Sequence, residues 1–301
     1  MSTPDKPPTL DPVAASRWAA RLLPASAWLH EEVARRMQER LDVIKLQPQA
    51  WADWEPLRGG LQAHQALRAR YPQAAVWQVV GQAGEAQRVQ AQTASAWWQP
   101  SRWTGPKVHA ACPPDGGVQM VWANMLLHQA ADPQMLIGQW HRALAVDGFL
   151  MFSCLGPDTL RELRALHMAM DWPAPAHEFT DMHDWGDMLV QAGFAEPVMD
   201  MERITLTFET PERLLQELRE LGRNLHVGRF AGLRGRGWRQ RWLQALAERG
   251  ERAGTAQLRL TFEVIYGHAL KPLPRTKMLQ ESQIGLADMR QMLAGRRVSR
   301  P

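Results

Sequence analysis

Apolar residues recur along this chain with two different spacings, and the spacing changes near residue 50. Over residues 18–46 they return every three or four positions with charged residues between them, which predicts helix. From residue 51 onward, short apolar segments alternate with longer helical patterns. The predicted elements, in order, are residues 51–54, 61–70, 75–80, 118–123, 135–144, 149–153 and 158–170. Alternation of this kind indicates an α/β protein with a mainly parallel sheet that is covered by helices on both faces.

The last third of the chain departs from this alternation. Residues 196–208 and 258–268 each have the pattern of a long strand, and Thr205 and Thr207 alternate with apolar neighbours. Between the two strands we expect a helix over residues 211–221 and then an arginine-rich stretch. Two strands that are distant in sequence and flank an insertion predict an antiparallel pair that closes one edge of the sheet.

These patterns divide the chain into four parts. We expect a disordered tail over residues 1–14, a helical N-terminal cap over 15–48, one α/β domain over 49–270, and a C-terminal tail over 271–301 with a helix at 286–293. The domain carries the helical and arginine-rich insertion at residues 211–256. Because no apolar run is long enough to cross a bilayer and the N-terminal segment is polar, we expect no membrane segment and no signal peptide.

Charge and cysteine content narrow the range of functions. Lysine and arginine number 35 against 31 aspartate and glutamate residues, a net charge of +4, which favours acidic partners without pointing to nucleic acid. Cys112 and Cys154 are the two cysteines, and neither belongs to a metal-binding pattern. We therefore expect no metal and, from so few cysteines, a cytoplasmic protein.

Candidate chemistry lies in the loops that follow the predicted strands, because an open parallel sheet binds ligands beyond the carboxyl ends of its strands. The loop DWEPLRGG, residues 53–60, follows the first strand and runs into a helix. Asn124 follows the strand at 118–123 and is a polar residue at the end of an apolar run. It is either a binding residue or a turn asparagine.

Several motifs occur in an order that is typical of one family. They are DGG at residues 115–117, WAN at 122–124, AVDGFLMFS at 145–153, LGPDTLREL at 155–163, DMHD at 181–184 and YGHA at 266–269. With these motifs the chain resembles the class I S-adenosylmethionine-dependent methyltransferases, and among them the malonyl-acyl-carrier-protein O-methyltransferases of biotin synthesis. The likeness covers roughly residues 15 to 275.

The resemblance implies a Rossmann-like fold whose seven-stranded, mostly parallel sheet has an antiparallel edge pair. It implies O-methylation of malonyl-acyl-carrier protein, with S-adenosylmethionine as cofactor and the acyl-carrier protein as partner. The cofactor would contact Asp53, Gly59, Gly60 and Asn124. Because the attacking carboxylate is already ionised, no catalytic base is required and none is identified.

The substrate carboxylate needs a cation, and arginine suits it because its guanidinium can bind both oxygens. Arg161 and Arg164 are the candidates, with His183 added by the resemblance alone. The alternative for the two arginines is a solvated helix face. Asp181 and Asp184 beside His183 could also suggest a metal site. Either aspartate fits equally well as the cap of the helix that follows.

The first half of the chain departs from the family pattern. Glu55 and Leu57 stand where the family has glycines, and the second strand offers no acid for the ribose hydroxyls before Glu85. A catalytically inactive methyltransferase-like partner or regulator that has lost cofactor binding is therefore the alternative hypothesis. Which of the two hypotheses holds, active enzyme or inactive partner, depends on whether the backbone at residues 54–61 leaves room for the nucleotide.

The arginine-rich stretch also has more than one interpretation. It contains Arg223, Arg229, Arg234, Arg236, Arg239 and Arg241 among interspersed glycines. Such a segment can dock an acidic carrier protein, contact nucleic-acid phosphates as a weaker third hypothesis, or form a solvated loop. Trp238 and Trp242 stand at helical spacing and are expected to pack together.

Overall fold

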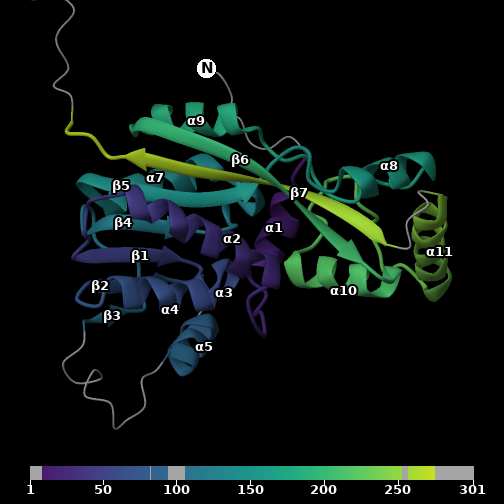
Figure 1. The fold of residues 1–301 in the computed structure, drawn as a ribbon, viewed down its shortest axis with the longest axis horizontal. Coiled ribbons are helices and arrows are strands. Elements are labelled where there is room, and N and C mark those ends of the chain that lie inside the picture. The colour runs from purple at the N-terminus through teal and green to yellow at the C-terminus, as the bar shows by residue number, and fades with distance from the viewer. Residues whose placement is uncertain (1–8, 82, 94–105, 253–256, 275–301) are drawn as a thin grey trace, which may run out of the picture.

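A computed structural model describes residues 9–81, 83–93, 106–252 and 257–274, and its centre is one seven-stranded sheet (Figure 1). The strands lie in the order β3-β2-β1-β4-β5-β7-β6. Their bounds are β1 Ala50–Trp54, β2 Ala75–Val79, β3 Val108–His109, β4 Val118–Ala123, β5 Leu144–Leu155, β6 Ala195–Phe208 and β7 Leu258–Leu270. The first five are parallel, whereas β7 runs antiparallel to both β5 and β6. The predicted parallel sheet with an antiparallel edge pair is confirmed.

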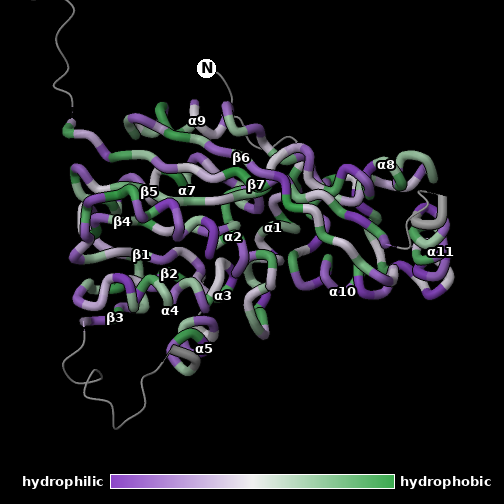
Figure 2. The backbone as a smooth tube through the Cα atoms, viewed as in Figure 1, coloured by the Kyte–Doolittle hydropathy of each residue, from purple (hydrophilic) through white to green (hydrophobic). Residues whose placement is uncertain are grey.

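Side chains that alternate along each strand build two hydrophobic cores, one on each face of the sheet. Trp51 points to one face with α2 (Trp28–Glu39), α4 (Leu61–Arg70), α8 (Arg161–Ala169), α10 (Pro211–Leu221) and α11 (Arg236–Arg252). Its neighbour Ala52 points to the other face, which α7 (Pro133–Ala143) and α9 (Met182–Gln191) cover. Figure 2 shows hydrophilic and hydrophobic residues interleaved along α10, as expected for a helix with one buried face.

The N-terminal cap differs from the single helical stretch predicted over residues 18–46. Helix α1 (Pro12–Ala19) begins inside the expected tail because the Asp11 carboxylate accepts hydrogen bonds from the first turn. Helix α1 ends at Ala19, and Pro24 keeps the residue before it out of helical geometry, so α1 and α2 are separate helices. Helix α2 ends in a 3-10 turn at Arg40–Val43. The short helix α3 (Pro56–Gly59) and α5 (Ala83–Thr93) complete the N-terminal half.

The insertion folds as predicted at its first helix, and α10 has the predicted bounds. Trp238 and Trp242 of α11 pack with ring centroids 6.3 Å apart, and both join the larger core. The helix predicted at residues 286–293 lies outside the described residues. Among the helices of the described ranges, none has the length and apolar character needed to cross a membrane.

Candidate functional site

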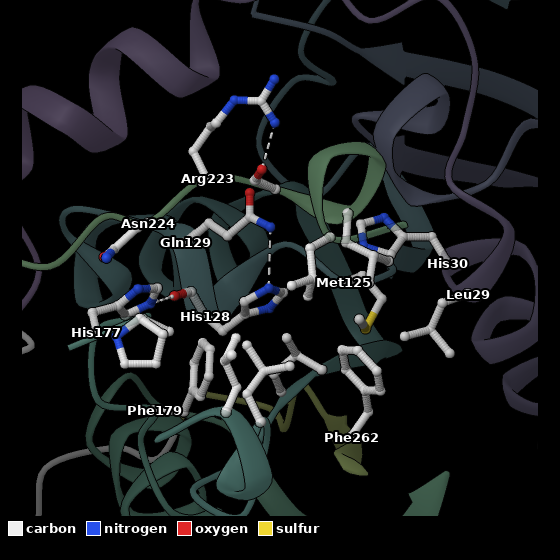
Figure 3. A pocket seen from close by; sticks show the side chains of 18 residues that line it. Leu29, His30, Met125, His128, Gln129, His177, Phe179, Arg223, Asn224 and Phe262 are labelled. Carbon is white, nitrogen blue, oxygen red and sulfur yellow. Dashed lines mark hydrogen bonds between the residues drawn. The ribbon is translucent and has the colours of Figure 1, made fainter. Parts of the chain in front are cut away.

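The strand order reverses between β1 and β4, which is where an α/β sheet of this kind binds ligands. Next to this point lies a cavity of about 140 Å³, shown in Figure 3. It is bounded by α2, the loop after β4, the segment at residues 175–179 and the end of α10. The hydrophobic part of its lining consists of Leu29, Met125, Leu155, Leu160, Leu163, Leu218, Leu221 and Phe262.

The polar part of the cavity contains two buried histidines with unused ring nitrogens. Trp18 can only donate, and its Nε1 bonds to Oε1 of Gln129, so the Gln129 amide nitrogen donates to Nε2 of His128 at 3.1 Å. The proton of neutral His128 is then on Nδ1, which has no hydrogen-bond partner among the described residues. His177 donates from Nε2 to the carbonyl of His128 at 2.8 Å, which leaves its Nδ1 as an unpaired acceptor. Both histidines line the cavity, and these two nitrogens are buried without partners among the described residues.

Burial keeps these imidazoles uncharged. It lowers the pKa of His30, whose Nδ1 donates to the carbonyl of Arg58 at 2.7 Å, to about 4. It also lowers the pKa values of His128 and His177, and the neighbouring His177 lowers that of His128 further. At neutral pH all three rings can serve as hydrogen-bond donors or acceptors, and none supplies a positive charge.

No sequence pattern pointed to His128 or His177. Each is a lone histidine outside the predicted elements, and neither belongs to a spacing that predicts a catalytic or metal site. Among the described residues the structure has no cluster of three metal-ligating side chains.

The loop after β1, where the family has glycines, folds into a compact turn that its own side chains fill. Glu55 adopts left-handed geometry with φ of 58°, and Pro56 occupies the first position of α3. The backbone N–H of Glu55 donates to the carbonyl of Val79 at 2.8 Å, and its Oε1 accepts from the N–H of Gly81 at 2.8 Å. The Glu55 side chain therefore bridges the carboxyl ends of β1 and β2.

Arg58 lies beneath this bridge and is only 8% exposed. Its Nη2 donates to Oε1 of Glu85 at 3.1 Å, to the carbonyl of Ala19 at 3.0 Å and to the carbonyl of Arg21. Its Nε lies 3.6 Å from Oε2 of Glu55. We call these three side chains, Glu55, Arg58 and Glu85, the ionic cluster.

Each residue predicted to hold the cofactor has partners within the protein. Asp53 is 2% exposed and accepts a hydrogen bond from Nδ1 of His64 at 2.7 Å. Asn124 donates to the carbonyls of His30, at 2.8 Å, and of Gly59, and it accepts from Ser153. Gly59 is explained by this contact, since an added Cβ would lie 3.1 Å from the carbonyl oxygen of Asn124. These three residues and Gly60, the four predicted to hold the cofactor, lie at the switch point, but none of them lines the cavity.

The three residues predicted to hold the substrate lie in different surroundings. Arg164 is half-buried beside the cavity, where it donates to the carbonyl of His177 at 3.0 Å and lies 5.4 Å over the ring of Phe179. Arg161 is exposed and bonds to its neighbour Glu162, as the solvated-face alternative expects. His183 is exposed in the first turn of α9, where Asp181 is the helix cap, and it does not line the cavity. Of the three, only Arg164 contacts residues that line the cavity, and it does not line the cavity itself.

The residues at the ends of β1 and β2 do not fit S-adenosylmethionine in this arrangement. A nucleotide that lies across these strand ends needs backbone uncovered by side chains and an acid for its ribose. Here Leu57 is buried in the loop, Glu55 is half-buried, and the residue after β2 is Val80. The cavity beside the loop is also smaller than the roughly 300–1,000 Å³ of a pocket for a ligand of that size.

Two solved structures have the same architecture as this chain. A putative methyltransferase from Bacillus halodurans C-125 superimposes with a TM-score of 0.54 at 15% identity, covering 80% of this chain and all of that one. The YcgJ protein from Bacillus subtilis gives 0.51 at 10% identity, covering 80% and 99%. The predicted class I methyltransferase fold is confirmed.

Sequence relatives are considerably closer. The chain is 40% identical over 271 residues to a malonyl-[acyl-carrier protein] O-methyltransferase from Gallionella capsiferriformans, covering 85% of this chain and 89% of the relative. Proteins of the same name from Methylovorus sp. and Laribacter hongkongensis are 39% and 36% identical, each covering 86% of this chain and 88% of the relative. No family model matches the sequence.

Proposed function

Because the chain belongs to the family of malonyl-[acyl-carrier protein] O-methyltransferases, we propose that it acts on a malonyl thioester that acyl-carrier protein presents. This membership confirms the enzyme class and the family cofactor, S-adenosylmethionine, that the resemblance predicted. The observation that carries the proposal is identity of 36–40% along nearly the whole length of relatives that share one name. When bound, the cofactor supplies the methyl group, and the chain's own residues hold the acceptor.

The cavity suits a small acyl group that ends in a carboxylate. Its leucine, methionine and phenylalanine side chains exclude water from one end, and His128 and His177 provide polar atoms at the other. The N–H at Nδ1 of His128 would donate to one carboxylate oxygen. Arg223 lines the cavity and Arg164 contacts its lining residues His177 and Phe179, so either guanidinium would compensate the negative charge. A carboxylate needs no base to become a nucleophile, so neutral histidines are sufficient.

A second groove, of about 280 Å³, gives the thioester a route to this cavity. It shares Leu163, Pro175, Leu218 and Asn224 with the cavity and is lined further out by Trp238 and Trp242. Arg229 and Arg234 line the same groove, and Arg234 stacks on the ring of Trp238 at 3.8 Å. An extended carrier arm with a phosphate would place its charge at the arginines and its thioester in the cavity.

The test measures transfer and binding separately. Labelled S-adenosylmethionine and malonyl-acyl-carrier protein are incubated with the full chain, and methyl ester is measured across cofactor concentrations up to the millimolar range. We expect methyl ester with the wild-type chain. Absence of methyl ester at every concentration would reject transfer by this chain, and absence of carrier-protein binding by calorimetry would reject the substrate.

His128→Ala tests the role of the cavity. Loss of a buried donor costs about 1–3 kcal/mol, so we expect kcat/KM for malonyl-acyl-carrier protein to fall by about tenfold or more. The control is His109→Ala on the edge strand β3, where the ring stacks on Trp77 away from the cavity. Equal activity of the two variants would remove His128 from the substrate site.

A second candidate function is favoured by the ionic cluster, which occupies the strand ends where a nucleotide would lie. Under this alternative the chain binds malonyl-acyl-carrier protein without transferring a methyl group and acts as a partner or regulator. It predicts carrier-protein binding together with no methyl ester, which the same experiment detects.

A further inference from the structure

We propose that Arg58, held by Glu55, Glu85 and the segment after α1, is an internal plug that occupies the cofactor crevice and must leave before a nucleotide sulfonium can enter. The inference rests on the proposed function only in taking the cofactor from the family. It explains how the chain keeps its fold at strand ends that in the family face a ligand. Four features of the described residues support it.

The first feature is the position of the cluster. Glu55 follows β1 directly and accepts from the N–H of Gly81, two residues after the end of β2. A cofactor ribose would bond to an acid at this strand end. Here the acid comes from the preceding loop and is paired within the protein, with the N–H of Gly81.

The second feature is the number of partners that Arg58 has inside the protein. A buried guanidinium needs an opposite charge and hydrogen-bond acceptors, and Arg58 finds them through Nη2, which bonds to the Glu85 carboxylate and to two carbonyls. Its Nε lies 3.6 Å from Glu55, and neither Nε nor Nη1 has a hydrogen-bond partner among the described residues. Glu85 is fully buried, so its carboxylate is not available to a ribose while Arg58 is in place.

The third feature is at the start of α4, the helix that follows the loop. The Glu31 carboxylate of α2 accepts from the N–H groups of Gln62 and Ala63 at 3.1 and 3.2 Å. A helix N-terminus attracts an anion, and here the Glu31 carboxylate of the protein itself takes that position. Gly60, with φ of 134°, allows this approach, because an added Cβ would lie 2.8 Å from Glu31 Oε2.

The fourth feature connects the plug to the surface assigned to the carrier protein. The carbonyls that hold Arg58 belong to Ala19 and Arg21, at the end of α1. Helix α1 is itself tied to the arginine-rich stretch, because Asp11 pairs with Arg229 at 2.6 Å and Arg223 lies 5.3 Å over the ring of Trp18. A partner that engages these arginines would act on the element that holds the plug.

The test compares binding of S-adenosylhomocysteine by calorimetry to three full-length chains: wild type, Arg58→Ala and Glu55→Gly/Leu57→Gly/Arg58→Gly. If the plug closes the site in most molecules, the apparent affinity for S-adenosylhomocysteine is the intrinsic affinity multiplied by the open fraction. We therefore expect the triple variant to bind at least about tenfold more tightly than wild type. We expect Arg58→Ala to lie between them. Equal affinity of all three chains, whether tight or undetectable, would overturn the proposal.

Arg88→Ala is the matched control, because Arg88 also donates to a carbonyl of the N-terminal segment, Leu23 at 2.6 Å, without touching the cluster. We expect it to bind S-adenosylhomocysteine like wild type. Should Arg58→Ala fail to fold by circular dichroism, Arg58→Lys keeps the charge but cannot reach every acceptor, and it is expected to bind more tightly than wild type as well. A gain in Arg88→Ala equal to that of the Arg58 variants would also overturn the plug.

Carrier-protein binding is measured on the same samples, so that the two proposals fail separately. Loss of carrier-protein binding by wild type contradicts the proposed function and leaves the plug in place. Tight binding of S-adenosylhomocysteine by wild type contradicts the plug and leaves the proposed function in place.

Discussion

At the scale of single residues, Glu55 makes stability depend on pH. Burial and the neighbouring Glu85 raise its pKa from 4.5 to about 8, so the folded state holds a proton that the unfolded chain releases. This contribution to stability is full below pH 4.5 and is lost as the pH rises toward 8. We predict that the stability of wild type relative to Glu55→Gln falls between pH 5 and pH 8, measured by urea unfolding. Parallel curves for the two proteins would show that Glu55 does not titrate in this range.

At the scale of elements, Gly267 explains how closely β7 packs on β5. An added Cβ at this position would lie 2.0 Å from Cε1 of Phe152, within the fully buried centre of the sheet. We predict that Gly267→Ala destabilises the protein by about 1–3 kcal/mol because the core must shift to accept the methyl group. Gly237→Ala in α11 is the control: it meets nothing within 4 Å and is expected to be neutral or slightly stabilising. Chemical denaturation measures the free energy of unfolding of both variants. Similar changes in the two would contradict this explanation of the glycine in the YGHA motif.

At the scale of the whole molecule, the modest net charge of +4 hides an uneven distribution, because arginines cluster in the insertion. Association with an acidic carrier protein should therefore weaken as salt screens the charges, since the Debye length falls from about 10 Å at 0.1 M to about 3 Å at 1 M. We predict that the association rate falls with ionic strength, measured by stopped-flow or surface binding. Arg234→Glu should lower the rate and flatten its salt dependence, whereas Arg35→Glu on α2 should change it little. A rate independent of salt would contradict docking through this surface.

Most of the fold could be predicted from the sequence, because apolar periodicity depends on neighbours along the chain. The strands 51–54 and 118–123 and the helices 61–70 and 211–221 follow local patterns that tertiary contacts did not override. Pro24 is a local helix-breaking signal, and the prediction of one helical stretch over residues 18–46 did not take it into account. The departure of Glu55 and Leu57 from the family's glycines was equally visible in the sequence.

The candidate site was less accessible to prediction. Of the residues expected to hold substrate, only Arg164 contacts the lining of the cavity, and the two lining histidines, His128 and His177, are 49 residues apart in the sequence. Such convergence depends on how loops pack against the ends of the sheet, which no local pattern records. Asp53 and Asn124 were correctly placed at strand ends, yet the sequence did not reveal that His64 and Ser153 would bond to them.

The sequence by itself determined the family, the order of strands and helices, and the loss of the glycine loop, because these follow from residue types at adjacent positions. Only the tertiary structure decided what took the place of that loop. Arg58, Glu85 and the carbonyls after α1 are distant in sequence, and a buried guanidinium is stable only when all of its partners converge in space.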